Sequence, residues 1–323
     1  MAHLSYKDGY YDGDVNYKNQ EHGHGTFIWH NGNKYVGEWR DGKKHGYGVE
    51  NHPDGSKYDG VWCDNKRNGN GFFRDRKGNE YDGEWRDDKR NGHGISYDRY
   101  GNKYIGAYRD DQENGYGVLR FVSGSKYEGE WLDGKMHGHG VYYYYSGAKY
   151  DGEFRNGKAH GHGVYYFSDG NRYEGEWLND QKHGHGVLYY SGGDRFDGQW
   201  RDDNRNGHGI YYYSSGSKYV GEWRNNEKHG HGAYYYSGGD RFEGEWRDNK
   251  RNGHGVLYYS NGERYDGEWL NDQKHGHGVY YFSSGNQYDG QWRNNKRNGH
   301  GKMTYRDGSC SEGEWRDDKK IDG

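Results

Sequence analysis

Histidine is the residue whose number and spacing most invite chemistry in this chain. Twenty His residues occur among 323, many of them in His-Gly-His triplets. Residues i and i+2 of a strand share a face, so each triplet could offer two nitrogen ligands to a metal. A zinc site needs three or four convergent ligands held by further hydrogen bonds. Because Asn replaces His freely in this series, we interpret the column as structural, with adventitious metal binding as the alternative, and expect no dedicated metal site. The triplets are His22/His24, His137/His139, His160/His162, His183/His185, His229/His231 and His275/His277.

A regular column of glutamates is the second chemical candidate. Its members are Glu38, Glu84, Glu130, Glu153, Glu176, Glu222, Glu245, Glu268 and Glu314. A glycosidase uses one carboxylate pair in a cleft, not a repeated series on one face. We therefore read the column as a solvated or ion-paired face. No Ser, Cys or His has the neighbours of a catalytic triad, and the Gly-His-Gly-His-Gly segments lack the Lys and helix of a phosphate loop. We expect no catalytic residue, no cofactor and no enzyme activity.

The overall composition limits the partners. Charged residues make up 30% of the chain with a net charge of −4, so no global field attracts nucleic acid or an anionic membrane. Cys63 and Cys310 lie far apart in the sequence, which favours a reducing compartment. No apolar run approaches the length of a membrane helix. We expect a cytoplasmic, soluble protein.

The elements that position these residues repeat every 23 residues. A ring opens a Y-x-G-x-W block in each unit, and the first unit is one residue out of step. The openings are Tyr11, Tyr35, Tyr58, Tyr81, Tyr104, Tyr127, Tyr150, Tyr173, Phe196, Tyr219, Phe242, Tyr265 and Tyr288. A fixed period of this size is typical of a solenoid, in which each unit buries its apolar face against its neighbours. We therefore expect one continuous array and no separate globular domains.

The unit Tyr173 to Arg195 predicts a β-hairpin. Its first run, Tyr173 to Trp177, alternates ring, charge, Gly, charge and ring, the period of a strand with one packed face. Its second run, His185 to Tyr190, is β-branched and aromatic. The polar residues 179–182 are expected to form the turn between the two runs, and 191–194 the turn to the next unit. No window has the apolar period of a helix.

Glycine occupies fixed columns in this hairpin. Gly175 lies between the two rings of its strand, and the Gly-x-Gly of the second strand clears space beside them. We expect Tyr and Trp rings to lie across bare glycine backbone. Each such Gly costs about 0.5 to 1 kcal/mol of conformational entropy, so the ring packing must offset that loss.

The recurrent Y-x-G-E-W, K-x-H-G-x-G-x-Y-x-Y and S-x-G-x-K segments resemble the MORN (membrane occupation and recognition nexus) repeat family. The resemblance covers the chain from Tyr11 onward. It implies an all-β fold, an elongated twisted single-layer antiparallel β solenoid of hairpins, with an aromatic-lined groove. We divide the chain into an N-terminal cap with a divergent first repeat at 1–34, the array at 35–310, and an incomplete C-terminal repeat at 311–323.

The function we expect is that of a structural scaffold. The groove would bind a helical or extended peptide of a protein partner, since Tyr and Trp dominate interface hot spots. Its predicted lining is Tyr127, Trp131, Tyr150, Tyr173, Trp177, Phe196, Trp200, Tyr219, Trp223, Phe242, Trp246, Tyr265 and Trp269. The family resemblance implies a place in a cytoskeletal, ciliary or membrane-junction assembly. Display on a bacterial or viral surface is a further alternative.

The sequence also suggests two other kinds of interaction, with lipid and with a second copy of the chain. The family's name suggests peripheral binding to anionic phospholipid, and Lys and Arg do pair in the turns, as in Lys250-Arg251, although nearby Asp residues offset some of that charge. The block Ser311 to Trp315 starts a hairpin without an evident second strand, and an unpaired edge is a template for another chain. We therefore expect a homodimer through residues 288–323, including Tyr288, Trp292 and Trp315. From the eighth unit Lys-His and Arg-Asn turns alternate with a period of 46 residues, which duplication of two-unit blocks explains, with the presentation of alternate hairpins to a repeating partner as the alternative.

Overall fold

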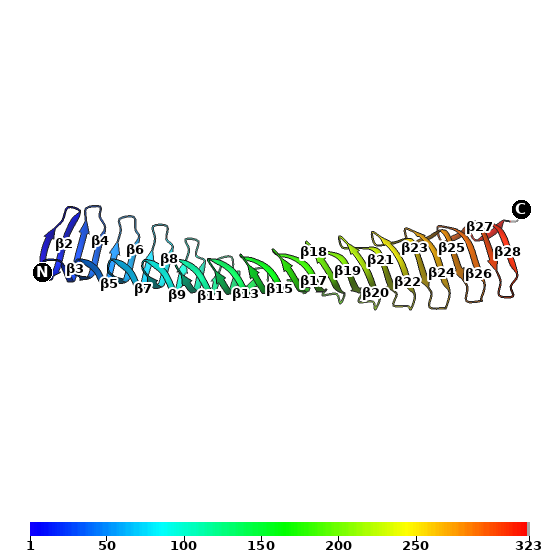
Figure 1. The fold of residues 1–323 in the computed structure, drawn as a ribbon, viewed down its shortest axis with the longest axis horizontal. Coiled ribbons are helices and arrows are strands. Elements are labelled where there is room, and N and C mark those ends of the chain that lie inside the picture. Colours follow the sequence, from blue (N-terminus) through cyan, green and yellow to red (C-terminus); the bar gives the residue numbers. More distant parts are fainter. Residues whose placement is uncertain (322–323) are drawn as a thin grey trace. The chain divides into compact units, whose positions relative to one another are not determined.

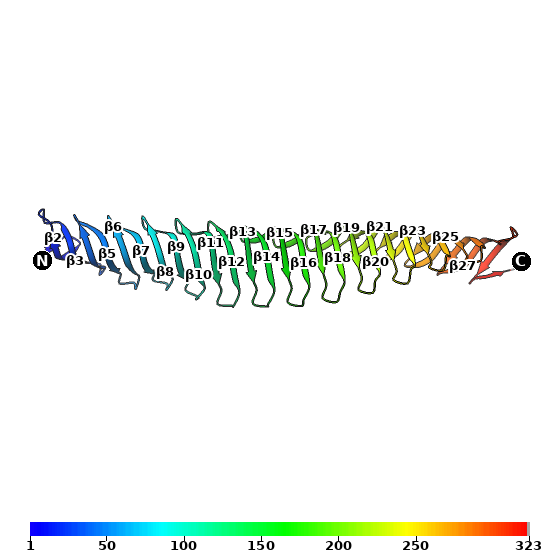
Figure 2. The same cartoon turned by 90° about the horizontal axis from the view of Figure 1, so that it is seen from below.

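The computed structural model describes residues 1–321, and these residues form 29 β-strands in one antiparallel sheet with no helix. No segment of this part of the chain is a helix with the length and apolarity to cross a membrane. The chain divides into two compact units, Met1–Gly161 and His162–Gly323, and strand β15 (Lys158–Tyr166) contains the dividing point. The hairpins of each unit follow one another in a single row (Figure 1), and the view from below shows the same row (Figure 2).

Within each unit, strands adjacent in sequence are hydrogen-bonded neighbours in the sheet. The first unit contains β1 (Ala2–Ser5), β2 (Gly9–Val15), β3 (Glu21–Trp29), β4 (Lys34–Arg40), β5 (Lys43–Asn51), β6 (Lys57–Cys63), β7 (Lys66–Arg74), β8 (Glu80–Arg86), β9 (Lys89–Tyr97), β10 (Lys103–Arg109), β11 (Gln112–Arg120), β12 (Lys126–Leu132), β13 (Lys135–Tyr143) and β14 (Lys149–Arg155). The second contains β16 (Arg172–Leu178), β17 (Gln181–Tyr189), β18 (Arg195–Arg201), β19 (Asn204–Tyr212), β20 (Lys218–Arg224), β21 (Glu227–Tyr235), β22 (Arg241–Arg247), β23 (Lys250–Tyr258), β24 (Arg264–Leu270), β25 (Gln273–Tyr281), β26 (Gln287–Arg293), β27 (Lys296–Thr304), β28 (Cys310–Arg316) and β29 (Lys319–Ile321). The predicted all-β class and single layer of antiparallel hairpins are confirmed.

The face of the sheet that carries the Tyr and Trp of the Y-x-G-x-W block is the core face. In β12 the Tyr127 ring meets the Trp131 ring edge-on at 5.3 Å, and Trp131 meets Tyr104 of the preceding hairpin at 5.2 Å. The Trp131 Nε1–H also donates to the Gly117 carbonyl of that hairpin at 3.3 Å. Edge-on ring pairs are each worth about 0.5 to 1.5 kcal/mol beyond their buried area. The ring contacts thus stabilise each hairpin and also join it to the preceding hairpin.

Glycine pairs make room for these rings, as expected. Gly129 of β12 lies opposite Gly140 of β13. A Cβ on Gly140 would lie 2.4 Å from the Tyr127 hydroxyl oxygen, and one on Gly129 would lie 2.5 Å from the Gly140 Cα. No larger residue fits either position without moving the ring or the neighbouring strand, so ring-on-backbone packing is the reason for these two columns.

A bulge in each hairpin explains the glutamate column. The register of β16 and β17 shifts between Gly175 and Glu176. At the bulge Gly184 takes a φ of 55°, and the Glu176 carboxylate accepts a hydrogen bond from the His185 backbone N–H at 2.9 Å. The same contact recurs at Glu130, Glu222 and other members of the series. The predicted solvated or ion-paired face is therefore incomplete, because these carboxylates also satisfy a backbone donor that the bulge leaves unpaired.

The turns are shorter than the sequence analysis expected. The segment 179–182 was predicted as the turn, but only Asn179 and Asp180 lie outside the strands, with φ of 52° and 73°. Two consecutive residues of positive φ form the tight turn that matches the twist of paired strands, and Asn and Asp tolerate that conformation best. Gln181 and Lys182 therefore belong to β17, which places the Lys182 side chain on a sheet face.

The C-terminal end of the array differs from the expectation. The strand β28 does have a partner, because β29 pairs with it from Glu314 opposite Ile321 to Arg316 opposite Lys319. The prediction that this hairpin lacks a second strand is therefore wrong, although β29 has only three residues. Residues 322 and 323 of the predicted incomplete repeat lie outside the described residues. At the other end, β1 pairs with β2 inside the segment 1–34 that was predicted as a cap.

Candidate functional site

The rings that were predicted to line a groove lie in the core. All thirteen, and also Tyr288, Trp292 and Trp315 of the predicted dimer segment, are at most 8% exposed. A ring buried to this degree has little surface left for a partner. Partner binding by these particular rings stays a prediction, and a peptide on the core face would first meet the side chains that surround them.

A column of cations covers the buried tryptophans of the second unit. The six members stand at the second position of the longer strand of each hairpin. They are Lys182, Arg205, Lys228, Arg251, Lys274 and Arg297, which we name the cation column. Each cationic group lies over the Trp of the next hairpin, for example Lys228 Nζ at 4.5 Å from the Trp246 ring centre and Arg251 Cζ at 4.2 Å from that of Trp269. The ring quadrupole attracts such a charge.

Only half of these cations have a carboxylate partner. Lys182, Arg251 and Arg297 pair with Asp203, Asp272 and Asp318 at 3.1 to 3.2 Å. The equivalent residues beside the other three are Asn226, Asn249 and Asn295, whose side-chain oxygens accept the backbone N–H of Arg205, Lys228 and Lys274 at 2.8 to 2.9 Å. Among the described residues, these three cations have no carboxylate within ion-pair distance.

Burial changes the pKa of the two lysines of the cation column that lie beside asparagine. Desolvation lowers the pKa of Lys228 and of Lys274 to about 8. For Lys228 the neighbouring Arg251 lowers the pKa further, while Asp272 opposes the shift. For Lys274 the opposing charges are Asp318 and Glu263. A desolvated ammonium without an ion-pair partner is stabilised strongly when it binds an anion, because the anion offsets the cost of desolvation.

Beside the cation column runs a ladder of half-buried rings. We define the ring ladder as the rings of this row from Tyr190 onward, namely Tyr190, Tyr211, Tyr213, Tyr234, Tyr236, Tyr259, Tyr280 and Phe282. Two ladder rings of one strand lie close together with their planes tilted by 45°, as for Tyr234 and Tyr236 at 4.4 Å, and between hairpins Tyr213 lies 5.6 Å from Tyr234. Carboxylates close the far side of the ladder, where the hydroxyls of Tyr211 and Tyr280 donate to Asp194 and Glu263 at 2.7 Å. None of these rings was among the predicted groove residues.

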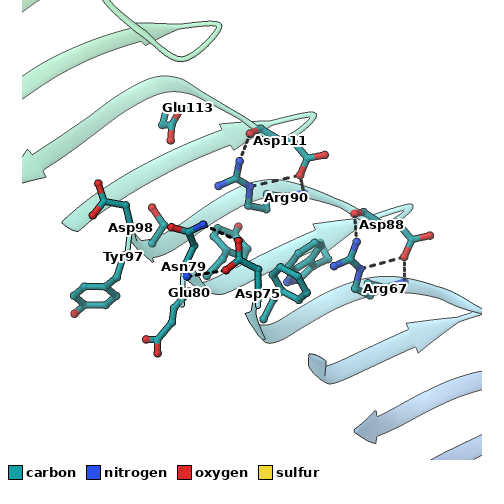
Figure 3. A pocket seen from close by; sticks show the side chains of 14 residues that line it. Arg67, Asp75, Asn79, Glu80, Asp88, Arg90, Tyr97, Asp98, Asp111 and Glu113 are labelled. Carbon is teal, nitrogen blue, oxygen red and sulfur yellow. Dashed lines mark hydrogen bonds and ion pairs between the residues drawn. The ribbon is translucent and has the colours of Figure 1, made fainter. Parts of the chain in front are cut away.

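Part of the first unit has a hollow at the ladder positions, whereas Phe121, Tyr142 and Tyr144 continue the row of rings further along that unit. At the hollow the equivalent positions hold one ring, Phe73, together with Glu50, His52, Asp75, Ser96 and Asp98, which are smaller than Tyr or Phe or are held in their own turns. Two cavities of about 430 and 390 Å³ result. They share Arg67, Phe73 and Asp88 in their linings, so they form one hollow on the core face between Lys44 and Glu113, which Figure 3 shows in part.

The cations in this hollow are already paired. Arg67 and Arg90 contact Asp88 and Asp111, and Lys44 contacts Glu50. Asp75 accepts hydrogen bonds from the backbone and side chain of Asn79, so its pKa is lowered although burial opposes the shift (Figure 3). The next three positions of the column are Glu113, Met136 and Ala159, which carry no positive charge. The uncompensated cations of the core face thus belong to the second unit.

The second histidine of several units lies within ion-pair distance of an aspartate on the opposite face of the sheet. His185 and His277 lie 3.2 and 3.0 Å from Asp197 and Asp289, and in each pair the histidine is well exposed. No group of three or more His, Cys, Asp or Glu side chains with metal-binding geometry exists within residues 1–321. The structural interpretation of the column therefore rests on its position at the bulge.

The repeated sequence pattern establishes the family to which the chain belongs. A family model described as the MORN repeat matches residues 10–34, 35–57, 58–80, 81–99, 104–126, 127–149, 150–172, 173–195, 196–218, 219–241, 242–264, 265–287 and 288–310. The chain belongs to the MORN repeat family. Each matched segment coincides with one hairpin whose rings rest on glycine, so the MORN pattern describes the core of the sheet.

Comparison of this MORN chain with curated protein sequences found no match. Similar solved structures include the SAS-4 (dCPAP) TCP domain of Drosophila melanogaster in complex with a proline-rich motif of Ana2 (dSTIL), which is 15% identical with a TM-score of 0.31 and covers 46% of this chain and 82% of that one. The TCP10 domain of Danio rerio CPAP in complex with a peptide of STIL is 10% identical, covers 94% of this chain and 99% of that one, and has a TM-score of 0.19. Likenesses this remote carry no argument about the MORN chain.

The MORN pattern alone could not identify the cation column. Lysine and arginine pairs such as Lys250-Arg251 suggested one basic edge, but neighbouring residues of a strand point to opposite faces. Lys250 is accordingly exposed, whereas Arg251 is only 17% exposed and lies over Trp269. The signal available in the sequence was the 46-residue alternation, whose Lys and Arg are members of the column.

Proposed function

We propose that this chain is a non-catalytic scaffold that binds a segment of a protein partner on the core face of its second unit. The supporting observation is the ring ladder beside the cation column, because Tyr and Arg side chains are enriched in interface hot spots. A place in a cytoskeletal or ciliary assembly is part of the proposal and follows from the family. So is its lack of enzyme activity, which the structural use of the glutamate column favours.

The test compares two faces of the same strands. The core-face variant carries Tyr213→Ser, Tyr236→Ser and Phe282→Ser. The fold tolerates polar residues at these positions, because the first unit has His52, Asp75 and Asp98 there. The outer-face variant carries Tyr212→Ser, Tyr235→Ser and Tyr281→Ser, one residue earlier on the opposite face and stacked under Arg195, Lys218 and Arg264.

The wild-type chain and the outer-face variant should retain the same protein from an extract of the source cells, and the core-face variant should lose it. Circular dichroism and thermal unfolding check that both variants fold. A protein that binds all three chains equally would contradict the proposed site, as would the retention of no protein by the wild type.

Peripheral binding to anionic phospholipid, which the family name suggests, is the alternative function. Polybasic attraction to a membrane contributes about 1 kcal/mol for each cation near the surface. The cations of the column, however, lie over Trp rings and beside the ring ladder, and Arg251 is only 17% exposed. Salt-sensitive pelleting with anionic liposomes that is lost in an outer-face charge variant would favour this alternative.

Homodimerisation through residues 288–323 also stays a prediction, and the mass of the purified chain by light scattering tests it.

A further inference from the structure

The spacing of the cation column restricts what can bind to it. Successive members lie one hairpin apart, and two strands at about 4.8 Å each give a repeat of about 9.6 Å. The column has six members, from Lys182 to Arg297, all inside the second unit. A ligand that meets several of them at once must present negative charge at the same interval and on one side.

Three peptide conformations can be compared with this interval. A polyproline II helix rises about 3.1 Å per residue with three residues per turn, so every third side chain returns to the same side after about 9.3 Å. An extended strand covers a similar length in three residues, but it places the third side chain on the opposite face. An α-helix returns to one side after seven residues and about 10.5 Å, so it falls out of step by about 1 Å at each hairpin. Polyproline II is the conformation that matches the column over several repeats.

The ring ladder suits the same conformation. Proline-rich polyproline II segments dock on aromatic surfaces, and they lose little conformational entropy on binding because they are already extended. The ladder rings lie next to the cations, with Lys228 Nζ at 4.9 Å from the Tyr234 ring centre and Lys274 Nζ at 4.3 Å from that of Tyr280. Asp194 and Glu263 on the far side of the ladder would repel carboxylates. Acidic side chains must therefore point to the cation column while the remaining residues cover the rings.

We propose that the second unit binds an acidic polyproline II segment of a partner protein, with a carboxylate at every third residue opposite the cation column. The proposal rests on the proposed function and adds the chemical class of the partner. Arg205, Lys228 and Lys274 are the principal anion receivers, because their neighbours Asn226, Asn249 and Asn295 are neutral. The choice of Asp or Asn in the next turn sets which cations keep an internal carboxylate, and it does not follow the 46-residue alternation, because Arg205 lacks the carboxylate that Arg251 and Arg297 have.

The experiment measures the binding of fluorescent synthetic peptides to the full chain by anisotropy at low and physiological salt. The peptide (Glu-Pro-Pro)6 has the matching period. The peptide (Glu-Pro)9 has the same length and more carboxylates but the wrong period, and (Lys-Pro-Pro)6 reverses the charge. We expect (Glu-Pro-Pro)6 to bind most tightly, with an affinity that falls as salt rises, and (Lys-Pro-Pro)6 not to bind. An equal or tighter affinity for (Glu-Pro)9, or for a helical peptide with Glu at every seventh residue, would overturn the conformational match.

A pair of protein variants tests the residues. Lys228→Met with Lys274→Met removes two uncompensated cations, and the fold accepts this change because Met136 occupies the same position in the first unit. Arg224→Gln with Arg247→Gln removes two exposed charges from the opposite face as the control. The first variant should bind (Glu-Pro-Pro)6 about tenfold more weakly or worse, and the control should bind like the wild type.

Equal binding by both variants would exclude the cation column as the site. If the chain retains a core-face partner in the extract experiment while no acidic peptide binds or competes, the ligand class is wrong and the scaffold function stands. If no core-face partner is retained at all, the scaffold function itself fails.

Discussion

At the scale of single residues, each core ring depends on a glycine pair beneath it. In the second unit a Cβ on Gly186 would lie 2.3 Å from the Tyr173 hydroxyl oxygen, and one on Gly209 would lie 2.5 Å from Cζ of Phe196. A Phe in place of Tyr therefore relieves little of the contact, because the ring itself occupies the space. The glycines are required by the ring that crosses them, whatever the ring carries at its tip.

Gly186→Ala should therefore destabilise the chain by about 1 to 3 kcal/mol, the usual cost of forcing a methyl group into a packed core. Chemical denaturation followed by tryptophan fluorescence measures the change. Gly192→Ala is the matched control, since a Cβ on Gly192 meets no atom within 4 Å and its effect should stay within about 0.5 kcal/mol. If the two variants unfold at the same denaturant concentration, ring packing is not the reason for the glycine column.

At the scale of the element, the hairpins are joined by their turns as well as by the sheet. Asp203, at φ 66°, is the second turn residue of its hairpin, and its carboxylate accepts the Lys182 backbone N–H of the preceding hairpin at 3.0 Å. Its own N–H donates back to the Lys182 carbonyl at 3.1 Å. One Asx residue thus serves two needs, a left-handed backbone and a side-chain acceptor for the neighbour.

Substitutions at Asp203 should separate these needs. Asp203→Asn keeps both and loses only the ion pair with Lys182, so it should be the least destabilising of the three changes. Asp203→Gly keeps the backbone conformation but loses the acceptor, at about 1 kcal/mol, and Asp203→Ala loses both, at about 1 to 2 kcal/mol more. Urea unfolding of the three variants should rank them Asn, Gly, Ala in decreasing stability. A Gly variant as stable as the Asn variant would mean that the link between hairpins contributes nothing.

At the scale of the whole molecule, buried lysines and buried tyrosines give opposite responses to alkaline pH. The pKa of Lys228 and of Lys274 is lowered by burial to about 8, and that of Tyr213 and of Tyr288 is raised by burial to about 12. Between pH 8 and the ordinary pKa of lysine, the unfolded chain holds more protons on these lysines than the folded chain does, so stability rises with pH. Above pH 10 the tyrosines of the unfolded chain lose protons that the folded chain keeps, so stability falls.

The thermal midpoint of the chain should therefore rise from pH 8 toward pH 10 and fall above it. In the Lys228→Met, Lys274→Met variant the rise should be smaller while the fall remains, because only the lysines have been removed. Differential scanning calorimetry across pH 7 to 11 makes the comparison. A wild-type midpoint that already decreases between pH 8 and 9.5, in parallel with the variant, would show that the two ammonium groups are not desolvated in the folded chain.

Much of this architecture could be predicted from the sequence, because it is local and repeated. The 23-residue period, the alternation of rings with charges around Gly175, and the paired glycines each require only neighbouring residues to specify them, and thirteen copies remove ambiguity. The same information was insufficient for Glu176, which was assigned to a solvated or ion-paired face although its carboxylate accepts the His185 backbone N–H at a bulge. It also missed β29, a strand of three residues too short to leave a pattern.

The sequence by itself determined that rings pack on glycine in successive hairpins. Only the tertiary structure decided which face each side chain joins. A side chain's face changes with every residue along a strand, so a two-residue turn where four were expected, together with one bulge, reassigns a whole strand. That is why the cations from Lys182 to Arg297, expected at a turn, lie instead over buried tryptophans beside the ring ladder.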